Sequence, residues 1–260
     1  MSKACVLVFA GLDPSGGAGI QADIQAISAA GAHPLPIVTA LTVQDNQRVH
    51  AVYPVEPSVL REQAGTLVEQ RTRIDAVKIG IVGSAANARQ IADVIIRLRA
   101  SQPDLPVVLD PVLASGHGDV LTKGDAVQAL APLRKLATLV TPNLPEAHAL
   151  CGADDLESQA AVLLRDAPHV LIKGGHGVGD SVVNAWFCEH DRRSWQWPRL
   201  SGEYHGSGCT LASAIAARLA KGMTMTAALE AAQRYTQRCL EQAFAIAGGQ
   251  AIPDRGKEIS

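Results

Sequence analysis

The sequence predicts an α/β fold in three layers, with a mostly parallel central sheet flanked by helices. Short apolar runs alternate with longer segments of helical periodicity through most of the 260 residues. Nearly every residue in these runs is apolar, as expected for strands whose two faces are both covered. Polar residues and glycines follow the runs, which is typical of an open sheet with a ligand crevice at the carboxyl ends of its strands.

The apolar runs predict strands at residues 4–10, 36–41, 76–79, 107–109, 138–140 and 170–172. Helical periodicity predicts helices at 18–30, 57–70, 85–101, 124–131, 144–150 and 157–165, and two more that run from the glycine turn near residue 206 to about 220 and from about 225 to 245. This alternation of strand and helix indicates parallel strands joined by right-handed crossovers.

Residues 181–198 follow a different pattern, because apolar and polar side chains alternate on either side of the charged turn 189–193. The alternation predicts a small β-hairpin added to the sheet. All three tryptophans fall in this segment: Trp186, Trp195 and Trp197. They either cover the edge of a small-residue core or form a platform on which a base can stack.

Length and composition favour one domain over residues 1–260. The chain is long enough to bury a full core, and no repeat, low-complexity tract or linker divides it. Hydrophobic residues make up 47% and charged residues 18%, with a net charge of −2, so neither disorder nor a nucleic-acid partner is expected. The tail 248–260 is expected to be loosely held.

The cysteines and the apolar segments indicate a cytoplasmic protein. The five cysteines are scattered, with no C-x-x-C pair, which argues against a disulfide framework or a zinc site and favours a reducing compartment. The apolar N-terminal run is far shorter than a signal sequence, so it is interpreted as the first buried strand. No apolar stretch reaches the roughly 20 residues of a membrane-spanning helix, and no membrane partner is expected.

The turn Gly206-Ser207-Gly208-Cys209 opens a helix and is a candidate anion site. Its glycines allow the backbone N–H groups to converge, and the helix adds the positive end of its dipole. A cysteine at a helix N-terminus is expected to have a lowered pKa, which makes Cys209 a candidate base or nucleophile. The alternative is a buried small residue after an ordinary glycine turn. His205 borders the turn and is a candidate ligand contact.

Asp110 and Glu146 are candidate ligands of Mg²⁺. Asp110 ends one apolar strand, and Pro142-Asn143-x-x-Glu146 begins a helix after the next one. Magnesium is usually held by one or two carboxylates together with water and substrate phosphate oxygens. The alternative for Glu146 is a first-turn acid that stabilises the helix dipole, with Asn143 as the N-cap.

Two further strand ends carry candidate ligand groups. The glycine-rich turn 11–19 follows the first strand and allows a ligand to approach the backbone, although its spacing matches neither a dinucleotide fingerprint nor a Walker A loop. Lys173 follows another buried strand and precedes two glycines. It either neutralises a phosphate or is an ordinary solvated strand-end lysine.

In this order the motifs resemble the hydroxymethylpyrimidine/phosphomethylpyrimidine kinases of thiamine biosynthesis, within the ribokinase-like superfamily. The resemblance covers nearly the whole chain. It rests on residues Gly11–Asp23, Thr39–Gln44, Lys78–Gly80, Leu109–Val112, Thr141–Ala147, Lys173–His176 and Gly206–Thr210. It implies a ribokinase-like fold with ATP and Mg²⁺ as cofactors, a small-molecule pyrimidine as the other substrate, and a homodimer.

The resemblance also implies a role for each motif. The pyrimidine is expected near Gly11, Asp23, Thr42 and Gln44. The nucleotide is expected along Asn143, Thr141, Lys173 and His205, with Mg²⁺ at Asp110 and Glu146. Gly206, Ser207 and Gly208 are expected to hold the charge that develops on the transferred phosphoryl group. Cys209 stands where most sugar kinases of the superfamily have an aspartate base, and it is expected to act as the base.

Two other functions compete with this one. A vitamin B6 kinase is possible because pyridoxal has a similar ring with a hydroxymethyl arm, although an amide such as Gln44 suits a ring nitrogen beside an exocyclic amine. A ligand-binding sensor without catalysis is the other alternative, and the presence of Asp110, Glu146, Lys173 and Cys209 together counts against it. The hairpin and the segment 114–119 are the expected covers of the site.

Overall fold

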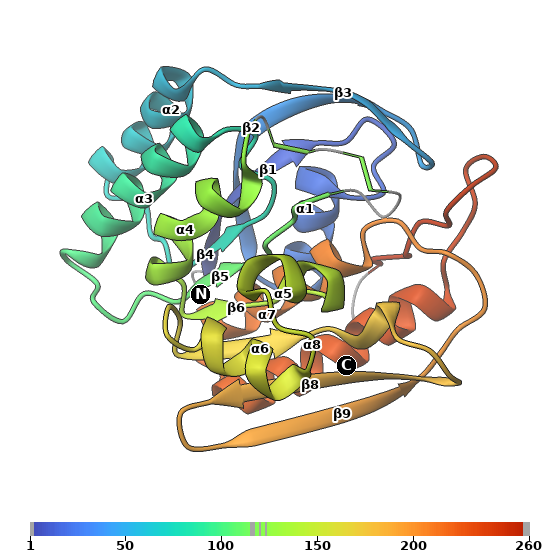
Figure 1. The fold of residues 1–260 in the computed structure, drawn as a ribbon. Coiled ribbons are helices and arrows are strands. Elements are labelled where there is room, and N and C mark those ends of the chain that lie inside the picture. The colour runs from blue at the N-terminus through green and yellow to red at the C-terminus, as the bar shows by residue number, and fades with distance from the viewer. Residues whose placement is uncertain (1–2, 115–117, 120, 123, 257–260) are drawn as a thin grey trace.

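The computed structural model describes residues 3–256 except 115–117, 120 and 123. One nine-stranded sheet, in the order β3-β2-β1-β4-β5-β6-β7-β8-β9, runs through it (Figure 1). Its strands are β1 (Cys5–Leu12), β2 (His33–Gln44), β3 (Val49–Pro54), β4 (Ala76–Ile79), β5 (Val107–Leu109), β6 (Leu139–Val140), β7 (His169–Ile172), β8 (Ser181–Cys188) and β9 (Arg192–Pro198). The six strands from β2 to β7 in this order are parallel, and β3, β8 and β9 are antiparallel to their neighbours.

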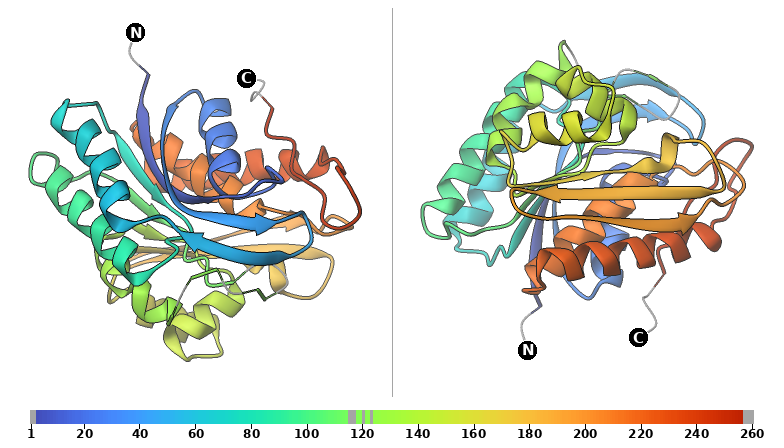
Figure 2. Two further views of the ribbon diagram at one scale, coloured as in Figure 1. Left: turned by 90° about the horizontal axis from the view of Figure 1, so that it is seen from above. Right: turned by 60° about the horizontal axis from the view of Figure 1, so that its bottom comes forward.

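Helices cover both faces of the sheet (Figure 2). They are α1 (Gly19–Ala29), α2 (Pro57–Glu69), α3 (Ala85–Arg99), α4 (Ala126–Leu136), α5 (Leu144–Cys151), α6 (Leu156–Leu163), α7 (Ser207–Ala220) and α8 (Met225–Glu241), with a short 3₁₀ turn at Gly174–His176. Alternation along β1 divides the core, because Val6 and Val8 pack with α1, α7 and α8, whereas Leu7 and Phe9 pack with α2, α3 and α4. Helices α5 and α6 cover the end of the sheet near β7 and β8.

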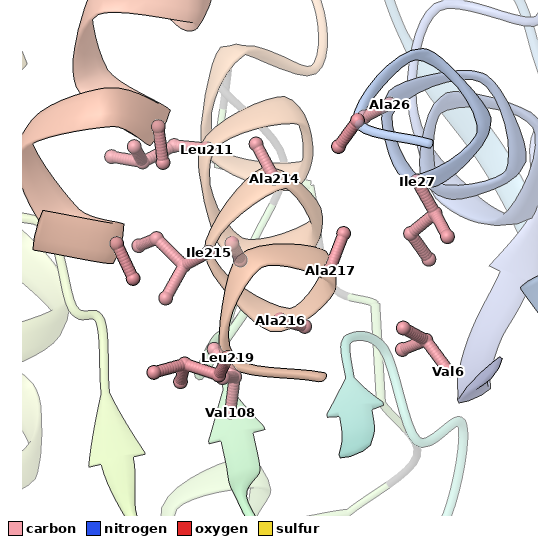
Figure 3. Packing of buried hydrophobic residues seen from close by; sticks show 14 of the residues in the cluster. Val6, Ala26, Ile27, Val108, Leu211, Ala214, Ile215, Ala216, Ala217 and Leu219 are labelled. Carbon is pink, nitrogen blue, oxygen red and sulfur yellow. The ribbon is translucent and has the colours of Figure 1, made fainter. Parts of the chain in front are cut away.

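Helix α7 is the most deeply buried of the three helices α1, α7 and α8 that cover one face of the sheet. Its fully buried alanines include Ala214, Ala216 and Ala217, which let it lie close to the strands and to α1 (Figure 3). Small side chains shorten the distance at which two elements pack. The N-terminus of α7 is thereby held next to the carboxyl ends of the parallel strands, which is the edge at which open α/β sheets bind their ligands.

The predicted strands and the hairpin 181–198 are confirmed, and so is the predominantly parallel sheet. Strand β3 was not predicted: it pairs with β2 at the edge, and its partly exposed residues lack a continuous apolar run. Helix α4 extends beyond the expected end at residue 131 and contains Pro132. One further turn buries Leu133 completely, and this burial compensates for the backbone hydrogen bond that the proline cannot donate.

The expectation of a loosely held tail is wrong for residues up to Gly256. Ala251 pairs with Tyr204, and Ile252 pairs with Phe244. Further along, Arg255 is only 5% exposed. The segment after α8 therefore returns to the body of the protein beside the residues that precede α7. Among the described residues, no helix is both long and apolar enough to cross a bilayer.

Candidate active site

A cavity of about 540 Å³ opens at the carboxyl ends of the parallel strands and at the N-terminus of α7. Twelve of the fourteen predicted site residues line it: Gly11, Thr42, Gln44, Asp110, Asn143, Glu146, Lys173, His205, Gly206, Ser207, Gly208 and Cys209. The structure thus brings together groups that are up to about 200 positions apart in the chain. The other two predicted residues, Asp23 and Thr141, lie behind the lining.

The anion turn begins at Gly206, which has a φ of 82° and caps α7. The Gly206 carbonyl accepts the Thr210 N–H at 3.0 Å and the Thr210 hydroxyl at 2.8 Å. The N–H groups of Ser207, Gly208 and Cys209 precede the first helical hydrogen bond and have no partner within the helix. Together with the helix dipole these N–H groups can hold negative charge, which is the property expected of this turn from its sequence.

Gly206 and Gly17 bring two glycine turns into direct contact. A Cβ at Gly206 would lie 2.0 Å from the Gly17 carbonyl oxygen, and one at Gly17 would lie 2.2 Å from the ring of His205. Neither space admits a side chain. The first glycine turn and the anion turn are therefore one packed unit, although they lie nearly 190 residues apart in sequence.

His205 and Asp13 join the same two turns through a side-chain pair. His205 Nε2 lies 2.8 Å from Asp13 Oδ2 and 3.3 Å from Gln44 Nε2. Burial raises the pKa of Asp13, but hydrogen bonds from His205, Ser15 and Ala18 outweigh it and lower the pKa overall. His205 lines the cavity as expected, yet its ring nitrogen is committed to Asp13. Asp13 was not predicted as a site residue, although the Asp-Pro-Ser turn it begins was a signal.

Cys209 is half-buried at the base of the anion turn. Burial raises the pKa of its thiol, against the lowering effects of the Lys78 ammonium and the Gly19 backbone N–H. The expectation of a lowered pKa is therefore wrong, because desolvation outweighs the helix dipole and the neighbouring cation. The sulfur is protonated at neutral pH in this state.

Lys173 and Asp110 form an ion pair on the floor of the cavity, with 2.7 Å between Nζ and Oδ1. A Cβ at Gly208 would lie 3.1 Å from Lys173 Nζ, so the ammonium borders the anion turn. Burial lowers the pKa of Lys173, but the carboxylates of Asp110 and Glu146 raise it overall. Lys173 is thus a fixed, charged group beside a turn that is built for negative charge.

Thr141 supports Asp110 from behind. Its hydroxyl donates to Asp110 Oδ1 at 3.2 Å, and the residue is completely buried and outside the cavity lining. The expectation that Thr141 contacts the nucleotide directly is corrected: its short side chain is directed to the carboxylate that ends the neighbouring strand. It orients a cavity residue.

Glu146 and Asn143 form a capping box at the start of α5. The Asn143 side chain accepts the Glu146 N–H, and Glu146 Oε2 accepts the Asn143 N–H, each at 2.8 Å. The helix-cap interpretation of Glu146 is confirmed, and the residue also lines the cavity. Burial, reinforced by the charge of Asp110, raises its pKa to about 7 against the opposing charge of Lys173.

The residues present fit a magnesium ion that is shared with substrate phosphates. No group of three or more His, Cys, Asp and Glu side chains suited to a metal occurs among the described residues. Magnesium needs only one or two protein carboxylates when phosphate oxygens and water complete its shell. Asp110 and Glu146 supply that number, and a cation beside them would offset the burial and the Asp110 charge that together raise the pKa of Glu146.

Asp23 is not a substrate contact. Its carboxylate is 0% exposed. Both carboxylate oxygens accept hydrogen bonds from Lys78 Nζ at 2.8 Å, and Oδ1 also accepts one from the Ser213 hydroxyl at 2.6 Å. The prediction is corrected because this helix face points into the core. Lys78, which was not predicted as a site residue, lines the cavity and is held by Asp23.

The β8–β9 hairpin closes one end of the cavity. Trp186 belongs to the core and Trp195 packs against it, whereas Trp197 lines the cavity. The indole N–H of Trp197 and the amide of Asn184 both donate to Gln233 Oε1, at 3.1 and 2.9 Å. Core cover is thus the role of two tryptophans, and the third contributes to the cavity wall.

Two segments near the cavity mouth approach one another. The predicted cover 114–119 includes residues 115–117, which lie outside the described residues. Its Asp119 accepts hydrogen bonds from Arg48, in the turn between β2 and β3, and from the N–H of Val49, the first residue of β3. Gln44, which precedes that turn, also lines the cavity.

Known proteins with similar sequences include several kinases. The family model described as phosphomethylpyrimidine kinase matches residues 13–253. Hydroxymethylpyrimidine/phosphomethylpyrimidine kinases of Streptomyces coelicolor and Rhizobium meliloti are each 37% identical to this chain, covering 96% and 95% of it and 94% of each relative.

Solved structures give a similar result. A Bacillus subtilis pyridoxal kinase in complex with ADP superposes with a TM-score of 0.87 at 27% identity, covering 98% of both chains. A phosphomethylpyrimidine kinase from Clostridium difficile superposes with a TM-score of 0.76 at 33% identity, covering 90% of this chain and 98% of the other.

Replacing Asp23 by Leu is expected to lower the free energy of unfolding by about 3–5 kcal/mol, because it leaves the Lys78 ammonium buried without its partner. The double variant Asp23→Leu/Lys78→Met is expected to recover most of the loss. Urea denaturation of both variants measures the effect. A single variant with unchanged stability and only a raised substrate KM would show that Asp23 contacts the substrate after all.

Glu146 is expected to make stability fall as pH rises. Its native pKa of about 7 lies above its ordinary value of 4.5, so between these values the native state binds a proton that the unfolded state has released. The free energy of unfolding therefore decreases with pH, by about 3 kcal/mol in total between pH 4.5 and 7. Glu146→Gln, which can keep the capping hydrogen bonds, is expected to remove this decrease. Urea denaturation at pH 5, 6, 7 and 8 measures it.

The matched control is Glu157→Gln, which changes an exposed acid in the first turn of α6. This control should leave the pH dependence as it is in the unmodified protein. Parallel curves for the unmodified protein and Glu146→Gln would exclude the raised pKa.

Proposed function

The chain belongs to the phosphomethylpyrimidine kinase family, and we propose that it transfers the γ-phosphoryl group of ATP to 4-amino-5-hydroxymethyl-2-methylpyrimidine and then to the monophosphate. One observation carries the proposal: the anion turn, the Lys173–Asp110 pair and Gln44 face a single cavity. An acceptor, a polyphosphate and the residues that neutralise charge can therefore meet at one point, which is the main requirement of phosphoryl transfer.

Gln44, Gly11 and Thr42 form the proposed pyrimidine end. An amide donates and accepts hydrogen bonds, so Gln44 can pair with both a ring nitrogen and an exocyclic amine. Gly11 is buried and lines the cavity, and the Thr42 hydroxyl donates to the Leu12 carbonyl at 2.8 Å and thereby ties β2 to β1. Thr42 thus supports this wall of the site from within the sheet.

Lys173, Asn143 and Glu146 form the proposed nucleotide end, with Trp197 at its margin. Lys173 offsets phosphate charge, and the N–H groups of Ser207, Gly208 and Cys209 hold the negative charge that develops on the transferred group. Asp110 and Glu146 would hold Mg²⁺, which when bound neutralises phosphate charge and orients the phosphate chain. His205 supports the adjacent anion turn indirectly, through its pair with Asp13.

In the proposed reaction the hydroxymethyl oxygen attacks the γ-phosphorus, the bond from that phosphorus to the β–γ bridging oxygen breaks, and ADP leaves. The hydroxyl proton goes to the Cys209 sulfur when that sulfur is a thiolate. Because burial raises the pKa of Cys209, only a minor thiolate fraction serves at neutral pH. The second transfer is to a phosphate that is already ionised, so it needs this base less.

The proposal is tested by ADP release from the purified protein with the hydroxymethylpyrimidine, its monophosphate, pyridoxal and pyridoxine supplied in parallel. Turnover of both pyrimidines is expected. Turnover of pyridoxal alone would assign the chain to the vitamin B6 kinases, which share its fold. Pyrimidine binding without turnover of any acceptor would instead support a sensor.

Cys209→Ala is expected to lower kcat for the hydroxymethylpyrimidine about 10²- to 10⁴-fold, the usual contribution of a general base, with a change in KM of only a few fold. The loss for the monophosphate should be smaller. Steady-state kinetics with both acceptors measure this difference, and Cys188→Ala, on the β8 strand, is the matched control. Unchanged kcat in Cys209→Ala would leave the backbone of the turn as the only catalytic element.

We also propose that the protein is a cytoplasmic homodimer. All five cysteines are free, which suits a reducing compartment. Leu12, Leu41 and Tyr53 are cross-strand neighbours on β1, β2 and β3, and they are 38%, 49% and 58% exposed. Val43, two residues beyond Leu41, extends the same face. A contiguous apolar row at a sheet edge supports burial against a second copy.

Tyr53→Glu is expected to break this dimer, because it puts a charge on the most exposed member of the apolar row, at the edge strand. Light scattering after size exclusion should change from twice the chain mass of 27.2 kDa to a single chain. Val178→Glu, at a fully solvated apolar position, is the control and should stay dimeric. Equal masses for the unmodified protein and Tyr53→Glu would exclude this face as the interface.

A further inference from the structure

Arg255 is a buried cation at the junction of the two glycine turns. It is 5% exposed and lies close to the C-terminal end of the described chain. Its Nε donates to the Thr210 hydroxyl at 2.8 Å, and its Nη2 donates to the Gly17 carbonyl and, at 3.4 Å, to the Gly206 carbonyl. One guanidinium thus contacts the first glycine turn and the anion turn at once.

The segment that carries Arg255 is fixed by backbone hydrogen bonds. The Ala251 N–H donates to the Glu203 carbonyl, and the Ala251 carbonyl accepts the His205 N–H, both at 2.9 Å. Further along, the Asp254 N–H donates to the Cys239 carbonyl at 3.0 Å, and the Tyr235 hydroxyl donates to the Arg255 carbonyl. The segment 251–255 therefore forms a strap that runs beside the residues preceding the anion turn, and the Arg255 side chain extends from it. Backbone hydrogen bonds fix the position of this strap.

The carbonyls that Arg255 binds determine where the next N–H groups point. In a trans peptide the C=O and the following N–H point in opposite directions. Holding the Gly206 carbonyl toward Arg255 therefore directs the Ser207 N–H the other way, out of the helix N-terminus. Holding the Gly17 carbonyl likewise turns the Ala18 N–H away, and that N–H donates to Asp13 Oδ2 at 2.7 Å.

The charge of Arg255 has no carboxylate partner among the residues that the structure describes. Its hydrogen-bond partners there are neutral oxygens: two carbonyls, the Thr210 hydroxyl and, at 3.4 Å, the Gln25 amide. A buried cation without an anion is costly unless its surroundings supply negative charge. The adjacent turn is built to receive an anion, and a bound phosphate would balance the guanidinium.

We propose that Arg255 is a positioning residue that aligns the N–H groups of the anion turn and adds positive charge to it, so that the turn favours the terminal phosphate of a nucleoside triphosphate. This inference rests on the proposed kinase function for its ligand. It adds a residue from the C-terminal strap, outside every motif of the sequence analysis. Arg255 touches no reacting atom; it acts through the Gly206 peptide.

The test compares ADP with AMP-PCP, a triphosphate analogue, by calorimetry in the presence of Mg²⁺. In Arg255→Gln the preference for AMP-PCP over ADP is expected to fall about tenfold, the effect of weakening one charge-assisted contact. Arg255→Lys keeps the charge but cannot reach both carbonyls, so its loss should be smaller. Arg234→Gln, an exposed arginine paired with Glu230 on α8, is the control and should bind both nucleotides normally.

Kinetics provide the second readout. Arg255→Gln is expected to lower kcat about 10²-fold, which is the usual effect of losing one donor to a developing charge. The KM for the acceptor is expected to stay within about threefold of its value in the unmodified protein. A purely structural role would lower the melting temperature of both Arg255 variants and leave the nucleotide preference and the kcat of the folded fraction unchanged. That result would overturn the proposal. If only Arg255→Lys folds, an unchanged nucleotide preference and kcat in this variant alone would overturn it as well.

Failure of the kinase proposal is distinguishable from failure of this one. If the unmodified protein binds both nucleotides but phosphorylates no pyrimidine, the acceptor assignment fails, and the nucleotide preference still decides the role of Arg255. If it binds neither nucleotide, both proposals fail.

Discussion

The contact between the two glycine turns is the constraint on which the site depends. A Cβ at Gly206 would overlap the Gly17 carbonyl, and a Cβ at Gly17 would overlap the ring of His205, which borders the anion turn. This contact puts the N-terminus of α7 beside the end of β1 and hence beside the acceptor side of the cavity. His205, Asp13 and Arg255 each reinforce it from a different part of the chain. The fold contributes a buried, small-residue helix that can approach closely enough for the contact to form.

Electrostatics at the nucleotide end is unbalanced in a way that suits charged ligands. Lys173 is paired with Asp110, but Glu146 stands close to the same pair and has a pKa raised to about 7. Arg255 is a cation without an anionic partner in the described structure. A magnesium ion would stabilise the buried Glu146 carboxylate and a polyphosphate would balance the charge of Arg255, so the two ligands suit the site when they arrive together. A site with perturbed charges of this kind sacrifices stability for binding.

The local sequence pattern was sufficient to predict the strands of the sheet and most of the residues at their carboxyl ends. Fully apolar runs predicted the parallel strands, and the polar residues after them predicted most of the cavity lining, because carboxyl ends of parallel strands share one edge. The pattern could not tell Asp23 and Thr141 from ligand contacts, since a buried carboxylate or hydroxyl that serves a neighbouring side chain looks the same in sequence. Arg255 could not be found at all: it meets Gly17 across 238 positions, and nothing near it in sequence indicates that contact.

The use of a thiol beside the anion turn follows from the charges around it. Asp23 and Asp110 both disfavour a negative charge on Cys209, and burial disfavours it further, while Lys78 and the Gly19 N–H favour it. A carboxylate at this position would add a permanent negative charge next to an incoming triphosphate. A thiol is neutral while the phosphates bind and becomes charged only by losing a proton. The same burial that makes the thiolate scarce makes it a stronger base when it forms. Phosphate binding favours a neutral group at this position, whereas proton removal needs a charged one. A thiol, whose intrinsic pKa is higher than that of a carboxyl group, can meet the two demands in turn.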